Sequence, residues 1–419
     1  MAKRYQQLVA ESMNANNALS SGLRPLPNDI TSFASTQAAW RFYKNDSVTL
    51  QKLQEPLLQA AQDNAVTYCK NYALIIHDWS RLNYRKHQSK LDKYQISHET
   101  DVGYDLQSSL LISDKTGLPL APVAQRLVTA NGSYSTYKNN ALEESVASHL
   151  DEVTTCIDYL QQQPFAKPLV HLIDREADSI RHIRYWQEQG YFWLVRAKDN
   201  PLVEFKKQTM KCAHIANSLS FNKIREVSYH GKTQWQWVAE AKIVITRDAH
   251  VQQNQKRTKL PGKPVEARLV VSRILSDTGE LLAQWLLITN VPAVEASEIA
   301  LWYYWRWKIE SFFKLLKSGG QNLESWQQET GLAVAKRLLV VSMACLLVWE
   351  IAASESEEVR SLRTFLIKLS GRQMKCGVEF TNPALLAGLW VFLSLLEVME
   401  SYSPEELAVL HKTANSFFG

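Results

Sequence analysis

The chain has 419 residues, which is enough for a large hydrophobic core and two or three domains. Its formal net charge is only +5, so a nucleic-acid surface would have to come from local clusters of cations and not from overall charge. The cysteines are scattered and odd in number, which argues against a disulfide framework and a zinc cluster and fits a reducing cytoplasm: they are Cys69, Cys156, Cys212, Cys345 and Cys376.

Residues 1–70 are predicted to form a small helical region, and two apolar runs after it each end in an aspartate. Residues 72–77 lead to Asp78, and residues 169–173 lead to Asp174. Short runs rich in branched apolar residues are typical of strands that are buried on both faces. An open α/β sheet presents functional groups at the ends of such strands. Either aspartate taken alone is more often a turn former or the N-cap of a following helix.

The elements around these two strands follow a regular order. Residues 103–129 predict two strands joined by a turn at 114–117, and residues 141–163 predict a helix. After the second aspartate, residues 177–187 predict another helix and residues 191–197 another strand. This order of strand, hairpin, helix, strand, helix and strand predicts an α/β fold with a mixed sheet flanked by helices.

Residues 200–284 are rich in β-forming residues, and polar and apolar residues alternate at 234–238. They predict an inserted, mainly antiparallel β domain between the last core strand and the helix that closes the core. The predicted domains are therefore a helical region at 1–70, a core at 71–330 that contains the insertion, and a helical C-terminal region at 331–419.

Residues 303–317 are predicted to form one amphipathic helix. At about 100° per residue, an arc of roughly 80° on one side carries a carboxylate, three cations and a phenol: Tyr303, Arg306, Glu310, Lys314 and Lys317. The opposite side is apolar and is expected to face the core: Trp305, Ile309, Phe312, Phe313 and Leu316. A solvated, salt-bridged face is the ordinary alternative, because Glu310 and Lys314 form a common i,i+4 pair.

The residues around the three acids resemble a known family. Asp174 opens the sequence Asp-Arg-Glu-Ala-Asp, and the helix has the pattern Tyr-x2-Arg-x3-Glu-x6-Lys from Tyr303 to Lys317. In these motifs the chain resembles the DDE transposases of the bacterial IS-four family, of the Tn-five transposase type, with their DREAD sequence and Y-R-E-K signature. Further similarity follows in the same order along the chain, at residues 39–42, 192–198 and 285–289.

The resemblance implies a DNA transposase that cuts at transposon ends and transfers the freed strands into target DNA. It also implies a ribonuclease-H-like core, in which Asp78, Asp174 and Glu310 bind the metal and carry the catalysis. Two Mg²⁺ ions roughly 3.5–4 Å apart would activate the attacking oxygen and neutralise the phosphate, and Mn²⁺ is an expected substitute. Metal activation leaves no need for a histidine base, so His77 and His171 are interpreted as strand residues.

The remaining polar residues of the helix are candidates for DNA contacts. Arg306 can bind a phosphate with two hydrogen bonds, and Tyr303 can donate one. Lys314 and Lys317 lie about one and two helical turns beyond Glu310, which places them to meet the DNA backbone farther along the strand.

Further candidates lie outside the helix. The resemblance implies that Trp285 stacks on a base turned out of the duplex, whereas a tryptophan in a strand is more often a packing residue. Arg196 and Lys198 follow the last core strand, where a phosphate contact and a plain surface charge are equally good interpretations. Arg41 lies in the match at residues 39–42 and is expected to contact DNA from the N-terminal region, which is shorter than the family's.

The C-terminal region contains two strongly apolar runs, at residues 338–349 and 384–396. Both runs are too short to span a bilayer and are interpreted as buried helices, so no membrane partner is expected. The resemblance implies a homodimer that assembles on transposon-end DNA through C-terminal helices. No signal peptide is visible, and the protein is expected in the bacterial cytoplasm, associated with DNA.

Two other functions remain open. A ribonuclease-H-like nuclease without strand transfer would have no reason to place Tyr303 and Arg306 around the carboxylate. A shortened regulatory relative that inhibits a full-length transposase is the second alternative, because the segment before Ala39 is shorter than in the family. The intact set of acidic residues argues that catalysis is retained.

Overall fold

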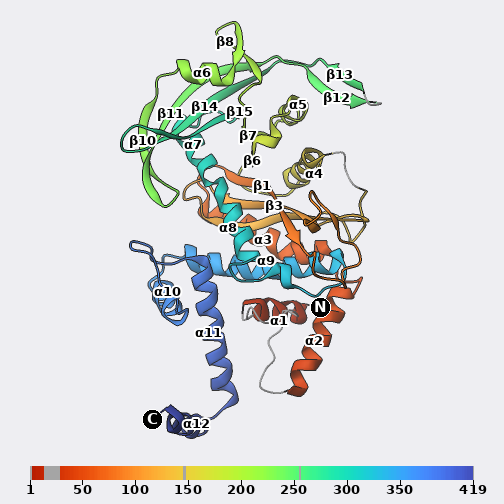
Figure 1. The fold of residues 1–419 in the computed structure, drawn as a ribbon, viewed down its shortest axis with the longest axis vertical. Coiled ribbons are helices and arrows are strands. Elements are labelled where there is room, and N and C mark those ends of the chain that lie inside the picture. The colour runs from red at the N-terminus through yellow and green to blue at the C-terminus, as the bar shows by residue number, and fades with distance from the viewer. Residues whose placement is uncertain (1, 14–28, 145–147, 254–255, 419) are drawn as a thin grey trace.

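One large mixed sheet runs through the computed structural model, with helices on its faces (Figure 1). The structure describes residues 2–13, 29–144, 148–253 and 256–418. Among these residues the sheet contains 13 strands, and its main path runs in the order β5-β4-β3-β1-β6-β7-β15-β14-β11-β8-β9. The prediction of a mixed α/β fold with a flanked sheet is therefore confirmed.

The central strands are parallel neighbours. β1 (Ala73–Asn83) pairs in parallel with β6 (Leu169–Ile173), and β6 pairs in parallel with β7 (Phe192–Arg196). On its other side, β1 pairs antiparallel with β3 (Val102–Ser113). The paired segments of these strands are almost entirely buried, as expected for continuous apolar strands that are covered on both faces.

The predicted hairpin is present at the edge of this core. β3 is joined to β4 (Pro119–Thr129) by a turn in which Gly117 has a φ of +66°. A Cβ atom at this glycine would lie 2.3 Å from the ring of Trp305, so the turn requires glycine both for its backbone conformation and for space. The sheet is completed here by β5 (Gly132–Ser135) and the short β2 (Tyr94–Gln95).

The strands after residue 200 continue the same sheet. β15 (Leu281–Thr289) pairs antiparallel with β7, and β14 (Val265–Leu275) pairs antiparallel with β15. The next strands outward are β11 (Lys232–Ile245), β10 (Asn222–Tyr229), β8 (Leu202–Phe205) and β9 (Gln208–Lys211). A separate two-stranded sheet contains β12 (Ala249–Gln253) and β13 (Lys256–Leu260). The segment is antiparallel within itself, and it is hydrogen-bonded to the core through β15.

Two hydrophobic cores lie on opposite faces of the sheet, because successive side chains of each strand point in opposite directions. Leu194 of β7 belongs to one core, whereas its neighbours Trp193 and Val195 belong to the other. The first core includes residues of six helices, which are α1 (Ala2–Met13), α2 (Asp29–Lys44), α3 (Leu50–Tyr68), α7 (Ala296–Tyr304), α8 (Lys308–Leu316) and α9 (Gly331–Ala353). The second includes residues of α4 (His149–Gln161), α5 (Ile180–Glu188) and α6 (Cys212–Ser218).

The α4 helix is shorter than predicted. It begins at His149 and not at residue 141, because the Ser148 side chain accepts a hydrogen bond from the backbone N–H of Asp151 and caps the helix. Upstream, Glu143 forms an isolated β-bridge with Ser133. The helical periodicity of the sequence therefore did not predict the residue at which the helix begins.

The segment 303–317 is not one helix, so that prediction is wrong. α7 (Ala296–Tyr304) ends in a 3₁₀ turn at Trp305–Trp307, and α8 (Lys308–Leu316) begins after it. The Trp305 ring packs over Gly117, and the turn directs Arg306 towards β1. The apolar side of α8 is buried as expected, with Ile309, Phe312, Phe313, Leu315 and Leu316 in or near the core.

The C-terminal helices are longer than the apolar runs that predicted them. α9 (Gly331–Ala353) and α11 (Asn382–Ser401) are, by length and composition alone, long and apolar enough to cross a membrane, which corrects the interpretation that both runs are too short. Most of α9 is buried, and it packs on β4 and α3. Most of α11 is not buried, and Figure 1 shows it leading away from the body to α12 (Pro404–Phe418), whereas α10 (Glu357–Leu369) packs beside it.

Leu339 and Leu395 provide a matched test of α9 as a core helix. Leu339 has no exposed surface, whereas the side chain of Leu395 on α11 is 45% exposed. We expect Leu339→Ala to lower the free energy of unfolding by about 2–5 kcal/mol, because it leaves a cavity in the core. We expect Leu395→Ala to change it by less than about 0.5 kcal/mol. Urea unfolding of the two variants measures both values, and equal effects would contradict the burial of α9.

Candidate active site

The two predicted aspartates lie beside each other at the edge of the parallel pairing. The pairing of β1 with β6 ends at His77 and Ile173, so Asp78 and Asp174 are the first residues beyond it. β1 itself continues past Asp78 along β3, which the sequence did not predict. Asp174 also caps the short 3₁₀ turn that follows it, because its Oδ1 accepts a hydrogen bond of 2.7 Å from the backbone N–H of Arg175.

Arg306 joins the three predicted acidic residues. Its Nη1 lies 2.7 Å from Oδ2 of Asp78, and its Nη2 lies 3.2 Å from Oε1 of Glu310 and 3.7 Å from Oδ2 of Asp174. The Arg306 side chain is 7% exposed, whereas the three carboxylates are 22–41% exposed. The structure therefore gathers the three carboxylates around one buried guanidinium and leaves them accessible from solvent.

A second layer of donors surrounds Asp174. The hydroxyl of Tyr303 donates a hydrogen bond of 2.9 Å to its Oδ1, and Nη1 of Arg196 lies 3.7 Å from the same oxygen. The ring of Tyr303 lies against the ring of Trp285, with 6.0 Å between the centroids. The structure thus brings four of the predicted DNA-contacting residues to the carboxylates: Tyr303, Arg306, Arg196 and Trp285.

The environment shifts the pKa values of the three acids in different directions. Burial raises the pKa of Asp78 above its usual range, and the charge of Arg306 only partly offsets this. The same balance of burial against Arg306 raises the pKa of Glu310, with repulsion from Asp78 in addition. Burial also acts on Asp174, but Arg306, the Arg175 N–H and the Tyr303 hydroxyl together hold its pKa below the usual value. Such divergence is typical of functional sites.

The donor set fits a hard divalent cation. Carboxylate oxygens are the ligands that Mg²⁺ prefers, and three of them meet here at a solvent-accessible point. In the described part of the chain, no three histidine, cysteine or acidic side chains form a ready-made metal cluster. The guanidinium of Arg306 stands among the carboxylates and balances part of their charge.

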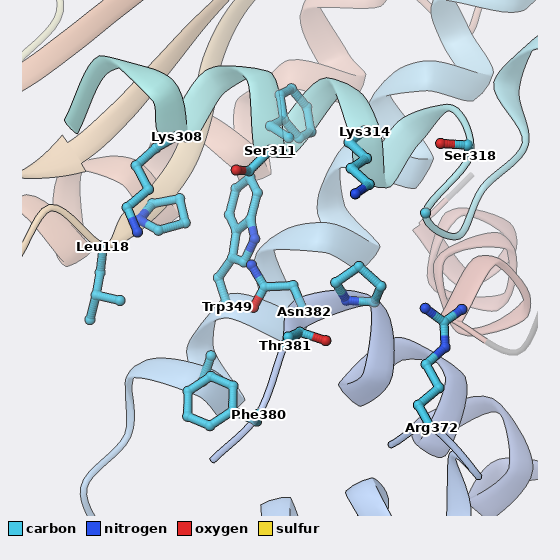
Figure 2. A pocket seen from close by; sticks show the side chains of 15 residues that line it. Leu118, Lys308, Ser311, Lys314, Ser318, Trp349, Arg372, Phe380, Thr381 and Asn382 are labelled. Atoms are coloured by element: carbon cyan, nitrogen blue, oxygen red, sulfur yellow. The ribbon is translucent and has the colours of Figure 1, made fainter. Parts of the chain in front are cut away.

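The other predicted DNA-contacting residues lie apart from this cluster. Lys317 donates to the backbone carbonyl of Arg81 and lies 3.4 Å from Glu324. Lys314 points into a cavity on another side of α8 (Figure 2). Lys198 is exposed after β7, and Arg41 is exposed on α2, which packs on α9. The single polar stripe that was predicted for residues 303–317 is therefore divided.

The sequence reasoning missed a network beside the carboxylates. Nε2 of His149 lies 3.3 Å from Asp105, its Nδ1 lies 3.3 Å from Glu176, and its ring stacks on Trp79 with 4.7 Å between the centroids. Hydrogen bonds to Asp105 and then to Glu176 raise the pKa of His149 to about 10. Trp79 follows Asp78 directly, and Glu176 lies two residues after Asp174. Through its contacts with both residues, His149 connects the ends of the two strands. The Asp-Arg-Glu-Ala-Asp motif was the available signal for Glu176.

The histidines inside the strands are fully buried. Nε2 of His77 lies 2.9 Å from Nδ1 of His171, and Nδ1 of His77 lies 2.9 Å from the hydroxyl of Ser109. Burial lowers the pKa of His77 to about 3 and that of His171 well below its usual value. Both rings are neutral at physiological pH and face the interior.

Comparison with known protein families matches residues 70–347 to the transposase DDE domain. The chain belongs to this family. The matched region extends from just before β1 into α9 and includes Asp78, Asp174 and Glu310. Transposases of this family act on DNA and are generally dependent on divalent metals, so the match supports a transposase function and a nuclease or transesterase chemistry. Comparison with curated proteins gave no match.

His149 gives this DDE domain a pH-dependent contribution to stability. In the folded protein it keeps its proton up to about pH 10, whereas in the unfolded chain it loses the proton near its ordinary pKa of 6.5. The contribution is therefore complete below pH 6.5 and is lost as the pH rises to about 10. We expect His149→Gln to destabilise the protein more at pH 6 than at pH 9.5 in denaturant titrations.

His98→Gln is the control, because His98 is exposed and does not belong to the network of His149. A loss of stability in His149→Gln that is the same at both pH values would contradict the charged bridge.

Proposed function

We propose that the chain is a cut-and-paste DNA transposase of the bacterial IS-four family, of the Tn-five type, with a ribonuclease-H-like core. The observation that carries the proposal is the meeting of Asp78, Asp174 and Glu310 around Arg306 inside the matched DDE domain. The proposed reaction is hydrolysis at the transposon ends, followed by transfer of the freed 3′ strands into target DNA.

The three carboxylates are the proposed ligands of two Mg²⁺ ions, for which Mn²⁺ can substitute. When bound, these ions activate the attacking oxygen and neutralise charge at the phosphorus. Arg306 brings a permanent charge to the site, and because its side chain is only 7% exposed, its electrostatic effect on a phosphate is larger than that of a surface arginine. We propose that Tyr303, whose single O–H donates to Asp174, turns this donor to a phosphate oxygen when DNA is bound.

A cavity that Trp285 lines supports the proposed role of this residue. It has a volume of about 380 Å³ and is lined by aromatic side chains, among them Trp285, Tyr304, Trp305 and Trp307. This volume lies in the range of small-ligand pockets. Trp307 is 52% exposed and borders the cavity on the solvent side. We infer that this aromatic cavity holds a base turned out of the duplex, which would relieve strain at a cut end.

The remaining DNA contacts and the domain division complete the proposal. We propose that Lys317, which is 27% exposed, and the exposed Lys198 contact the backbone of end DNA. We propose that the region 1–70, with Arg41, contacts DNA, that 71–330 is the catalytic core with its insertion at about 200–284, and that 331–419 is the dimerising region. The proposed location is the bacterial cytoplasm, in association with DNA.

The exposed face of α11 and α12 supports a homodimer on DNA. Both helices expose large apolar side chains, which are Leu395, Leu396 and Met399 on α11 and Val409 and Leu410 on α12. Exposed apolar residues grouped in this way are typical of an interaction surface. We propose a two-fold dimer that holds two transposon ends and uses contacts within residues 383–410.

Glu310 and Glu298 provide a matched pair for testing the catalytic assignment. Each pairs with an arginine at 3.1–3.2 Å, and their side chains are 41% and 45% exposed. We expect Glu310→Gln to lower Mg²⁺-dependent cleavage of plasmid DNA carrying the gene's flanking inverted repeats by orders of magnitude, with DNA binding retained. We expect Glu298→Gln to cleave normally.

Cleavage near the wild-type rate in Glu310→Gln would refute the metal mechanism. A pre-cut end with a free 3′-OH tests the second step. Cleavage without any joined product would identify a nuclease, and DNA binding without cleavage by the intact chain would identify a regulatory relative.

The apolar face of α11 provides the test of dimerisation. We expect the double variant Leu395→Glu and Met399→Glu to bind end DNA but to form far fewer two-ended complexes, because charged groups oppose the burial of this face. Light scattering of the protein with duplexes ending in the flanking inverted repeat measures the mass of the complex. Leu91→Glu alters a side chain that is 79% exposed elsewhere and is the control. Two-ended complexes in normal yield from the double variant would contradict the proposed interface.

A further inference from the structure

A larger cavity, which we call the basic cleft, lies against α8 and contains none of the three carboxylates in its lining (Figure 2). Its volume is about 600 Å³. Its walls come from α8, from the end of α9, from the turn between β3 and β4, and from the connection between α10 and α11. Segments that are far apart in the sequence therefore build it together.

The charge of the basic cleft is entirely positive. Lys308, Lys314 and Arg372 are among the 15 residues that line it, and none of the 15 is an aspartate or glutamate. Within the described part of the chain, none of these three cations forms an ion pair. The N-terminus of the 20-residue α11 also opens at its wall, at Thr381. Cations that lack counter-charges in one concave site attract an anion.

Other side chains of the basic cleft suit a nucleic-acid strand. Ser311, Ser318, Thr381 and Asn382 offer hydroxyl and amide groups to phosphate oxygens, and Figure 2 shows them around the same space as the cations. The half-buried ring of Phe380 borders the same space, whereas Trp349 in its wall is only 3% exposed. Cations interleaved with aromatic rings are the usual combination for binding a single strand, because the cations follow the backbone and the rings meet the bases.

The basic cleft adjoins the aromatic cavity of the active site. Lys308 and Ser311 lie about one turn apart on α8 and line both cavities. The aromatic cavity and the basic cleft therefore share one side of α8, whereas Glu310 points to another side of the same turn.

We propose that the basic cleft binds the phosphodiester backbone of a single DNA strand that continues from the active site past the aromatic cavity. The proposal rests on the proposed transposase function and adds a binding site to it. A cavity of this size accepts a short stretch of one strand and excludes a duplex. A small phosphate compound would contact only the cations of the basic cleft. It would not extend into the adjoining aromatic cavity, as a DNA strand can.

Lys308 and Arg372 are the residues that test the basic cleft, since neither touches the carboxylates. We expect the double variant Lys308→Gln and Arg372→Gln to bind a labelled single-stranded oligonucleotide about tenfold more weakly in fluorescence anisotropy, in EDTA. The slope of log K against log salt concentration should become shallower by about 1.4, because two phosphate contacts are lost from a single strand. A duplex of the same sequence should lose much less affinity.

Arg360→Gln is the matched control, because it removes an exposed arginine from α10 outside the basic cleft. It should leave affinity and slope unchanged. Arg372→Gln alone, in an exposed loop, repeats the test if the double variant is unstable.

Unchanged single-strand affinity and slope in the double variant would overturn the basic cleft, and so would an equal loss for duplex. Competition by inorganic phosphate at the same concentration as the oligonucleotide would also overturn it. The proposed function is judged separately by cleavage in Glu310→Gln, so it can stand while the basic cleft fails. If the intact chain binds no DNA at all, both proposals fail.

Discussion

The ion-pair cluster of Arg306 with three carboxylates imposes the strictest constraint on this fold. A guanidinium that is 7% exposed needs counter-charges, and three acids at one point need a cation, so neither side of the cluster is stable without the other. The pair Asp78 and Arg306 is 228 residues apart in sequence, which means that the cluster ties the first core strand to the last core helix. Breaking it would leave several charges unpaired in a partly desolvated site.

Three features of the fold bring the residues of this cluster together. Parallel pairing of β1 with β6 places Asp78 and Asp174 side by side. The insertion after β7 returns through β15, which pairs with β7 itself, so a long excursion of the chain does not move the last helices away from the core. The 3₁₀ turn between α7 and α8 then brings Arg306 to the carboxylates while Trp305 anchors the turn on Gly117.

Much of this arrangement could be predicted from the sequence, because the strands are continuous apolar runs and the acids carry specific neighbours. The hairpin turn at Gly117, the strands that lead to Asp78 and Asp174, and the apolar face of α8 all follow from local patterns. The features that the sequence did not predict depend on tertiary contacts and on helix capping. The helix 303–317 is broken because Trp305 and Arg306 have different partners, and α4 begins late because Ser148 caps it. The bridge of His149 and the basic cleft combine residues from distant segments, so no local pattern could reveal them.

We propose that Asp78, Asp174 and Glu310 form one divalent-cation site in which Arg306 balances part of the carboxylate charge. Crystals soaked in Mn²⁺ and measured for anomalous scattering test it most directly, because the ion can be located without reference to activity. We expect Mn²⁺ to be coordinated by oxygens of these three carboxylates, at about 2.0–2.2 Å as for similar hard ions. We also expect Arg306 to have moved away from at least one of them. Mn²⁺ bound only elsewhere, with Arg306 still in contact with all three acids, would contradict it.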